Sequence, residues 1–259
     1  GEGRVRSFGI LSTFPPTSCG IATFSAALSA GLIATGASVD VVRVGPPPEL
    51  EDVLVVASLD GRTPAHRAAA TDALNADDVV IVQHEYGLYD GPDGESIIEL
   101  MAAIDVPIVV VAHTVLSHPT TNQRRVLEQV CAAADAVVVM TETARTRLIE
   151  GFDVDHSKVT LIPHGATTPP ATPTDTPMAD RRRPGEPARL LTWGLLGPGK
   201  GIEWAIDAMS EFSDLDPHPE YVIAGSTHPK VREHSGEAYR EMLVDRAARS
   251  RSAAHVTFD

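Results

Sequence analysis

A glycine-rich segment with a single lysine follows an apolar run near the C-terminus. It reads GLLGPGKG, in which Gly194, Gly199 and Lys200 have the spacing of a phosphate-binding P-loop. A P-loop continues with a Ser or Thr hydroxyl that binds magnesium, whereas this chain has Gly201, and Pro198 removes one N–H group that would hold phosphate. The residues therefore weaken the case for a nucleoside triphosphatase. They leave two interpretations, an anion site of another kind and a tight strand–helix turn with a surface lysine.

A second candidate anion site lies near the N-terminus, in the segment STFPPTSCGIATFSAAL (12–28). Its two prolines make a rigid loop, and Gly20 lies directly before a predicted helix. Helix N-termini bind anions, and ligands of open α/β sheets gather at the carboxyl ends of strands. We therefore expect the loops at Gly20 and Lys200 to face each other across a cleft between two α/β domains. Each loop would hold one end of a sugar nucleotide.

Short apolar segments rich in Val and Ile predict the strands that position these loops. They show little polar alternation, which is typical of parallel sheets covered by helices on both faces. The expected strands are 5–12, 38–44, 53–57, 79–84, 108–112, 136–140 and 159–162, with helices at 22–35, 121–134 and 141–150. Thr141 is the expected N-cap of the last helix, which Gly151 ends. This alternation predicts a doubly wound α/β domain.

The composition changes at 167–187, which is rich in Pro and Thr and has no apolar period. This segment is predicted to be an interdomain linker between domains at 1–166 and 188–259. The second domain is expected to contain strands at 189–193 and 221–225, helices at 201–212 and 236–250, and the start of another strand at the last residues. A doubly wound sheet needs more strands to cover its helices, so we expect this domain to be incomplete here. A small, complete domain is the alternative.

The charge balance narrows the classes of partner. The 259 residues include 21 basic and 35 acidic side chains, for a net charge of −14. This argues against a nucleic-acid surface and against a broad basic membrane face, so any membrane association is expected to be peripheral. No apolar run approaches the roughly 20 residues of a membrane span, and no signal peptide is visible, so the cytoplasm is the expected location. Cys19 and Cys131 have no metal spacing, and no metal or cofactor is expected.

Five segments occur together in one order: FPPTSCGIATF, AHT (112–114), VVMTETAR (138–145), LIPHG (161–165) and WGLLGPGKGIEWAI (193–206). With them the chain resembles a retaining glycosyltransferase of the GT-B fold, family 4. The resemblance implies two Rossmann-like domains, an acceptor-side domain followed by one that binds a nucleotide-diphospho-sugar. It also implies transfer of a hexose such as mannose or glucose to a carbohydrate, lipid or small-molecule acceptor.

The resemblance assigns roles to single residues. The backbone N–H groups at Gly20 and Ile21 would approach the donor diphosphate. His113 would contact the transferred sugar near the reacting centre. Lys200, next to Gly199, would pair with the donor phosphates, so His113 and Lys200 are the expected catalytic residues. The transition state would be oxocarbenium-like, with charge on the leaving diphosphate. The donor's own phosphate oxygen would take the acceptor proton, so no protein base is assigned.

The chain departs from the family pattern at several positions. Cys19 replaces the first glycine of a usual Gly-Gly pair, and Leu195 stands where an arginine is common. His164, a further expected donor-binding residue, occupies the place of an asparagine. The family's paired glutamates would lie beyond Asp259. We therefore expect residues 1–259 alone to have little or no transferase activity.

The segment VQHEYGLYDGPDGE (82–95) follows a predicted strand and is rich in polar and aromatic side chains. His84, Glu85 and Tyr86 are predicted to contact the acceptor, and Glu85 is also a candidate base. A structured loop with a few hydrogen bonds is the equal alternative.

Other functions stay open at this point. The same fold could serve a sugar-nucleotide epimerase or a sugar phosphorylase. A two-lobed, non-catalytic sugar-binding protein is the alternative from another class, although it would be expected to have a signal peptide and more than one interdomain crossing. Binding of a nucleoside diphosphate without magnesium would favour the transferase.

Overall fold

The computed structural model describes residues 6–47, 52–60, 63–166 and 185–259. The chain divides into two compact units, Gly1–Thr167 and Thr168–Asp259. The predicted linker lies outside the described residues except for 185–187, so its bounds stay a prediction.

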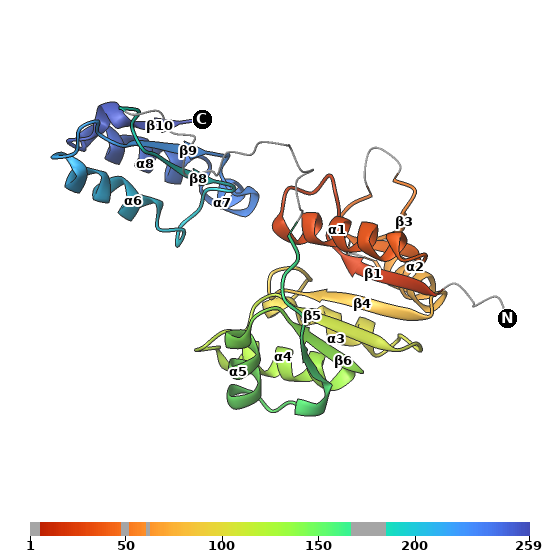
Figure 1. The fold of residues 1–259 in the computed structure, drawn as a ribbon. Helices are drawn as coiled ribbons and strands as arrows, with labels where there is room; N and C mark the ends of the chain where they lie inside the picture. Colours follow the sequence, from red (N-terminus) through yellow and green to blue (C-terminus); the bar gives the residue numbers. More distant parts are fainter. Residues whose placement is uncertain (1–5, 48–51, 61–62, 167–184) are drawn as a thin grey trace. The chain divides into compact units, whose positions relative to one another are not determined.

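The first unit is built on a seven-stranded parallel sheet with strand order β3-β2-β1-β4-β5-β6-β7 (Figure 1). Its strands are β1 Ser7–Ser12, β2 Ser38–Val44, β3 Val55–Leu59, β4 Val79–His84, β5 Ile108–Ala112, β6 Ala136–Val139 and β7 Val159–Leu161. The order reverses between β1 and β4, which pair with each other in parallel. Ligands of such sheets bind outside the carboxyl ends of the strands at this reversal.

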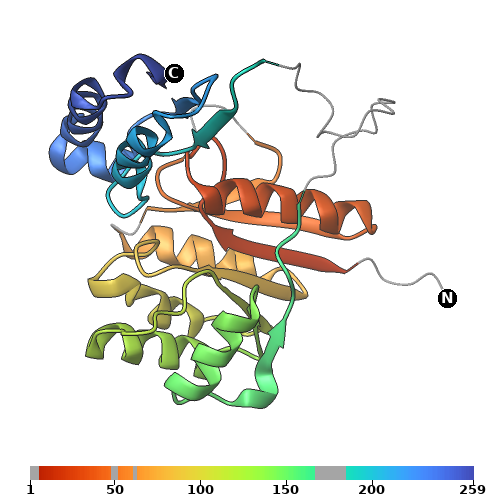
Figure 2. The same cartoon turned by 60° about the vertical axis from the view of Figure 1, so that its left-hand side comes forward.

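Helices cover both faces of this sheet, as the apolar strands predict. They are α1 Gly20–Ala34, α2 Pro64–Asn75, α3 Ser96–Met101, α4 Thr121–Ala133 and α5 Glu142–Gly151, with short 3-10 turns η1 Pro92–Gly94 and η2 His156–Lys158. One face is covered by α1 (Figure 2). Phe24 of this helix packs against the core on that face. The opposite face is covered by the other helices, which contribute Leu74, Leu100, Leu127 and Leu148 to the larger core. The doubly wound α/β prediction is confirmed for this unit.

The second unit has a three-stranded parallel sheet with order β10-β9-β8. Its elements are β8 Arg189–Trp193, α6 Ile202–Ala208, η4 Met209–Phe212, β9 Glu220–Ala224, α7 Pro229–Ser235, α8 Ala238–Arg249, η5 Ala253–His255 and β10 Val256–Phe258. The predicted helix 201–212 is therefore an α-helix followed by a 3-10 turn. Ile206, Ile223 and Leu243 are fully buried in the core of this unit.

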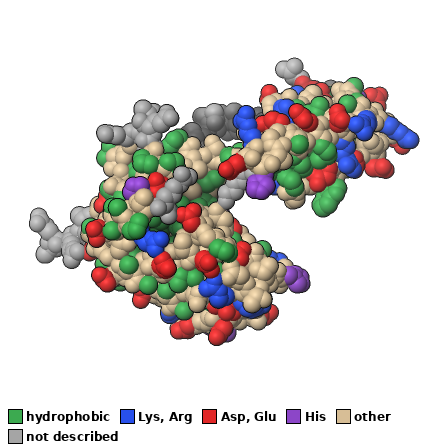
Figure 3. Space-filling view, turned by 180° about the vertical axis from the view of Figure 1, so that it is seen from behind, with side chains coloured by type: hydrophobic (Ala, Val, Ile, Leu, Met, Phe, Trp, Pro, Cys, Tyr) green, Lys and Arg blue, Asp and Glu red, His purple; other side chains and the backbone are tan. Residues whose placement is uncertain are grey.

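The distribution of charged side chains on the surface is consistent with the net charge of −14. On the face drawn in Figure 3, acidic side chains are interspersed with basic and neutral ones, and the described residues form no continuous basic area there. Among the described helices, none combines the length and apolarity needed to cross a bilayer.

Asp77 is a buried carboxyl at the edge of the sheet opposite to the strand carboxyl ends. It is 6% exposed, and its Oδ2 atom has no hydrogen-bond partner among the described residues. Burial, and then the neighbouring charge of Asp40, raise the pKa of Asp77 from 3.8 to about 6. Between about pH 4 and about pH 6, Asp77 therefore keeps a proton in the folded state that it has already released in the unfolded chain. Stability should therefore fall as pH rises from about 4 to about 6, and stay reduced above that.

We expect Asp77→Asn to stabilise the protein at neutral pH, because a neutral amide removes the buried charge. Its melting temperature should exceed that of the wild type by at least about 2 °C at pH 7.5. At pH 4, where Asp77 is itself protonated, the difference should vanish. Scanning calorimetry at both pH values measures this, with Asp72→Asn, an exposed position on the preceding α2, as control. An equal gain at both pH values would contradict the assignment.

Candidate functional site

The segments after β1, β4 and β5 bring polar side chains to the carboxyl edge of the first sheet. Parallel pairing aligns Gln83 with Val111 and His84 with Ala112. Because side chains alternate between the faces of a strand, Gln83 and His84 point to opposite faces. Gln83 lies on the face covered by α1, and His84 lies on the face of the larger core.

The loop before α1 ends in a helix N-terminus with no acidic side chain in its first turn. Cys19 is the N-cap: its Sγ accepts from the Ala22 N–H at 3.4 Å and lies 3.2 Å from Thr13 Oγ1. A Cβ added to Gly20 would meet no atom within 4 Å. The space beside Gly20 is therefore open, at the end of α1 where the first backbone N–H groups can attract an anion.

A buried arginine holds this loop from the neighbouring strand. Arg43 of β2 is 6% exposed. It donates to Phe14 O at 3.3 Å, to Thr17 Oγ1 at 2.7 Å and to Pro46 O. No carboxylate pairs with Arg43 in the described part of the chain. Among the described residues, the hydrogen bonds of this guanidinium all end on neutral oxygens, so no described carboxylate offsets its positive charge beside the loop.

His113 follows β5 and is held at three points. Its backbone N–H donates to His84 O at 3.0 Å, and its Nε2 lies 2.7 Å from Gln83 Oε1. The ring also meets Phe24 edge-on, with centroids 5.0 Å apart. Burial, and then the nearby His164, lower the pKa of His113 from 6.5 to about 4. At neutral pH His113 is therefore an uncharged imidazole that can exchange hydrogen bonds with ligand hydroxyls.

His164, which follows β7, lies near His113. The His164 ring also packs against the Phe24 ring, and the two ring centroids are 5.1 Å apart. His164 Nδ1 lies 2.9 Å from Gly165 O. The imidazole is exposed. The structure thus brings together two residues that the sequence predicts separately, with Phe24 between them.

The three residues predicted to contact the acceptor differ in their surroundings. His84 is 1% exposed, and neither ring nitrogen has a partner among the described residues. Burial, and then His113, lower the pKa of His84 to about 4. Both carboxylate oxygens of Glu85 are engaged, by the Thr114 hydroxyl and by the Tyr86 N–H at 3.0 Å. Tyr86 is 8% exposed and belongs to the larger core, so its burial does not favour a direct contact with an acceptor.

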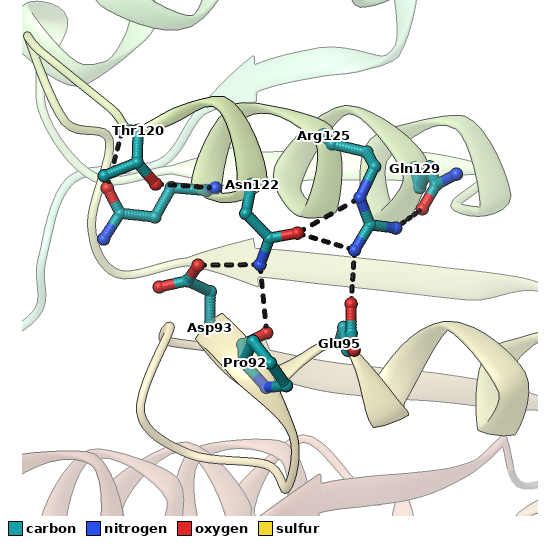
Figure 4. Close-up of polar contacts among 8 residues, drawn as sticks. Pro92, Asp93, Glu95, Thr120, Asn122, Arg125 and Gln129 are labelled. Atoms are coloured by element: carbon teal, nitrogen blue, oxygen red, sulfur yellow. Dashed lines mark hydrogen bonds and ion pairs between the residues drawn. The ribbon is translucent and has the colours of Figure 1, made fainter.

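The remainder of this loop is fastened to α4 (Figure 4). The Asn122 side chain donates to Asp93 Oδ2 at 2.8 Å and to Pro92 O at 3.3 Å, and Arg125 pairs with Glu95. Asp93 has a left-handed backbone, with φ of 54°. The loop after β4 is therefore a structured loop held by several hydrogen bonds, as the alternative to acceptor binding predicts. Its hydrogen bonds hold Glu85 in place whatever that residue contacts.

The glycine-rich segment of the second unit forms a tight turn between β8 and α6. Gly194, Gly199 and Gly201 have φ values of 118°, 83° and 71°. Gly201 is the N-cap of α6, and a Ser or Thr at this left-handed position would be strained. This explains the glycine where a P-loop has its hydroxyl. Lys200 is exposed, and no acidic group of the described residues pairs with it.

The comparison with known families separates the interpretations. A family model described as Glycosyltransferase Family 4 matches residues 19–168, which is more than half of the chain. This chain belongs to glycosyltransferase family 4.

The D-inositol 3-phosphate glycosyltransferase of Corynebacterium efficiens is 26% identical to this family 4 chain over 156 residues. The match covers 54% of this chain and 37% of that relative, so it spans well under half of the relative's length.

Two solved structures have the same fold as the family 4 chain. The sucrose-phosphate synthase of Thermosynechococcus elongatus matches with a TM-score of 0.70 and 17% identity, over 98% of this chain and 70% of that chain. The Anabaena protein HepE, solved with UDP-glucose, matches with a TM-score of 0.64 and 13% identity. This match covers 98% of this chain and 68% of HepE. At these identities the likeness shows the fold alone, the α/β Rossmann-like fold of GT-B glycosyltransferases.

Several site residues of the family 4 chain escape the sequence prediction. Gln83 directly precedes the predicted His84, and strand alternation would have placed it on the opposite face. Phe24 is one helical turn after Gly20. Arg43 is a charged residue inside an apolar strand, which is itself a signal because such residues are rarely buried without a role. Within the described residues, no three His, Cys, Asp or Glu side chains converge as a metal-binding group.

Proposed function

We propose that the protein containing this chain transfers a glycosyl group from a nucleotide-diphospho-sugar to an acceptor, with retention of configuration. The donor sugar is a hexose such as glucose or mannose, and the acceptor is a carbohydrate, a lipid or another small molecule. Family membership supports a transferase. The complex of HepE with UDP-glucose and the relative named as a glycosyltransferase support a sugar-nucleotide donor.

One juxtaposition in the first unit carries this proposal. An uncharged imidazole, His113, contacts Phe24, which lies one turn from the open helix N-terminus at Gly20. A sugar diphosphate needs both kinds of partner, a hydrogen-bonding group for its hydroxyls and a positive end of a helix for its phosphates. Both lie at the carboxyl ends of strands beside the reversal in strand order, where α/β sheets bind ligands.

The proposed chemistry follows from these groups. As the bond between sugar and diphosphate breaks, negative charge grows on the leaving phosphate. The N–H groups at Gly20 and Ile21 stabilise that charge in the first unit. We propose Lys200 and Gly199 as the phosphate-binding residues of the second unit. Both oxygens of Glu85 already accept hydrogen bonds, from Tyr86 and Thr114, so we assign this carboxylate a structural role and not that of the base. The donor's own phosphate oxygen therefore takes the acceptor proton, and no metal is required.

Titration calorimetry and mass spectrometry with a panel of UDP-, GDP- and ADP-sugars test this function. We expect micromolar to millimolar binding of one nucleoside diphosphate without magnesium, and slow release of its sugar. Binding that requires magnesium would favour a nucleoside triphosphatase instead. Binding of the free sugar without its nucleotide would favour a sugar-binding protein.

A further inference from the structure

The buried amide of Gln83 and the imidazole of His113 are hydrogen-bonded to each other. Gln83 is 0% exposed at the end of β4, and its Oε1 atom lies 2.7 Å from His113 Nε2. The imidazole also packs against the Phe24 ring in a T-shaped arrangement, with an interplanar angle of 88°. The ring therefore cannot rotate freely about its last bond, and its two nitrogens have different surroundings.

An amide oxygen can only accept a hydrogen bond. His113 Nε2 must therefore donate, which places the single proton of the neutral ring on Nε2. Nδ1 then carries the lone pair, and it has no partner among the residues that the structure describes. Burial disfavours the doubly protonated ring, since it lowers the pKa of His113 to about 4.

The Gln83 amide is not explained by folding needs. Its Nε2 atom is buried and finds no hydrogen-bond partner in the described part of the chain. Most buried polar groups in native proteins are paired, because an unpaired one lowers stability. An apolar side chain of similar size would avoid that loss, so the contact with His113 is the feature that a glutamine supplies and a methionine would not.

We propose that Gln83 is a positioning residue that holds His113 as the neutral Nε2–H tautomer, so that Nδ1 accepts a hydrogen bond from one ligand hydroxyl. The site then selects a ligand that presents a hydroxyl donor at this point, and discriminates against one with an ether or a deoxy carbon there. That the ligand is a sugar rests on the proposed function, whereas the tautomer does not.

Nitrogen-15 NMR of the labelled chain at pH 7 tests the tautomer without any ligand. Long-range proton–nitrogen spectra distinguish a protonated ring nitrogen from one with a lone pair, and His113→Gln assigns the signals. We expect Nε2 protonated and Nδ1 unprotonated in the wild type, with a titration midpoint near pH 4. A protonated Nδ1 would overturn the proposal, because it would mean that the Gln83 amide faces the ring with its nitrogen.

Three variants separate positioning from packing. Gln83→Met should keep or raise the melting temperature and give a mixture of the two tautomers. Gln83→Glu should place a carboxylate beside Nε2 and raise the midpoint of His113. Gln129→Met, on the exposed side of α4, is the matched control and should leave the His113 signals unchanged. Wild-type His113 signals in Gln83→Met would overturn the proposal.

Binding of two probes tests the ligand contact. Gln83→Met should weaken UDP-glucose binding by the factor by which the Nε2–H fraction falls, about twofold for an even mixture. It should leave UDP binding unchanged, because UDP lacks the glucose hydroxyls. Equal weakening of both probes would contradict a sugar contact at His113. If neither probe nor any other sugar nucleotide binds the wild type, the proposed function fails and the hydroxyl contact fails with it. The NMR result would still decide the tautomer.

Discussion

Replacing Gly20 with alanine is expected to abolish most nucleoside-diphosphate binding while the fold stays intact. The added methyl group meets no protein atom within 4 Å, so it causes no clash. It does occupy the open space beside the first N–H groups of α1, where the phosphates must approach. We expect affinity to fall at least about tenfold, which is the loss of roughly one charge-assisted hydrogen bond. Titration calorimetry with UDP measures this.

The same helix offers a matched control. Gly31 lies in the interior of α1, and an alanine there also meets nothing within 4 Å. Gly31→Ala should leave UDP binding unchanged and stabilise the protein by about 0.5–1 kcal/mol, since alanine is the better helix former. If Gly20→Ala binds UDP as the wild type does, the phosphate does not lie at this helix N-terminus.

Replacing Lys200 with alanine in the longer protein should lower the rate of transfer by about 100-fold or more, the usual effect of removing one group that stabilises transition-state charge. Lys200 is the one cationic side chain of the turn GLLGPGKG (194–201), in which Leu195 is apolar. Initial rates at saturating donor, for the donor that the screen identifies, are the measurement.

The control for Lys200 removes a positive charge elsewhere in the same unit. Arg249 is exposed on α8 and pairs with Asp245. Arg249→Ala should leave the rate of transfer within about twofold, because an exposed ion pair contributes little. Equal rates for Lys200→Ala and the wild type would remove Lys200 from the site. The chain 1–259 should itself transfer little or no sugar, and a rate comparable to that of the longer protein would contradict this.

The strands could be predicted from the sequence because most of them are short runs rich in Val and Ile. β2, β4 and β5 have the predicted bounds, since each run of β-branched residues ends at a polar or small residue. The sequence does not predict the helices α2 and α3, because neither shows a clear apolar period. In α2 only Ala70 and Leu74 are buried, and α3 has six residues, too few to show a helical period.

The predicted roles of the candidate-site residues stay predictions, and the sequence did not predict the contacts of Gln83, Phe24 and Arg43. Position in the chain predicts that His113 and His164 follow strands, and parallel pairing brings strand ends to one edge. Which face of the sheet α1 covers is a tertiary outcome, and it decides that Gln83 meets His113 while His84 turns into the core. The polar character of the segment after β4 predicts that Tyr86 contacts the acceptor, whereas the ring is buried among the apolar residues of the larger core. The burial of Tyr86 depends on tertiary packing, which the local sequence does not reveal.

Arg43 gives the loop before α1 its shape during folding rather than on ligand binding. Its hydrogen bonds to Phe14, Thr17 and Pro46 order the chain on both sides of the strand that carries it. Ordering a flexible loop on binding would subtract conformational entropy from the affinity. A loop that is already rigid avoids this loss, so the phosphate meets a preorganised set of N–H groups. The entropy of association should then be set mainly by released water and by the ligand's own freedom.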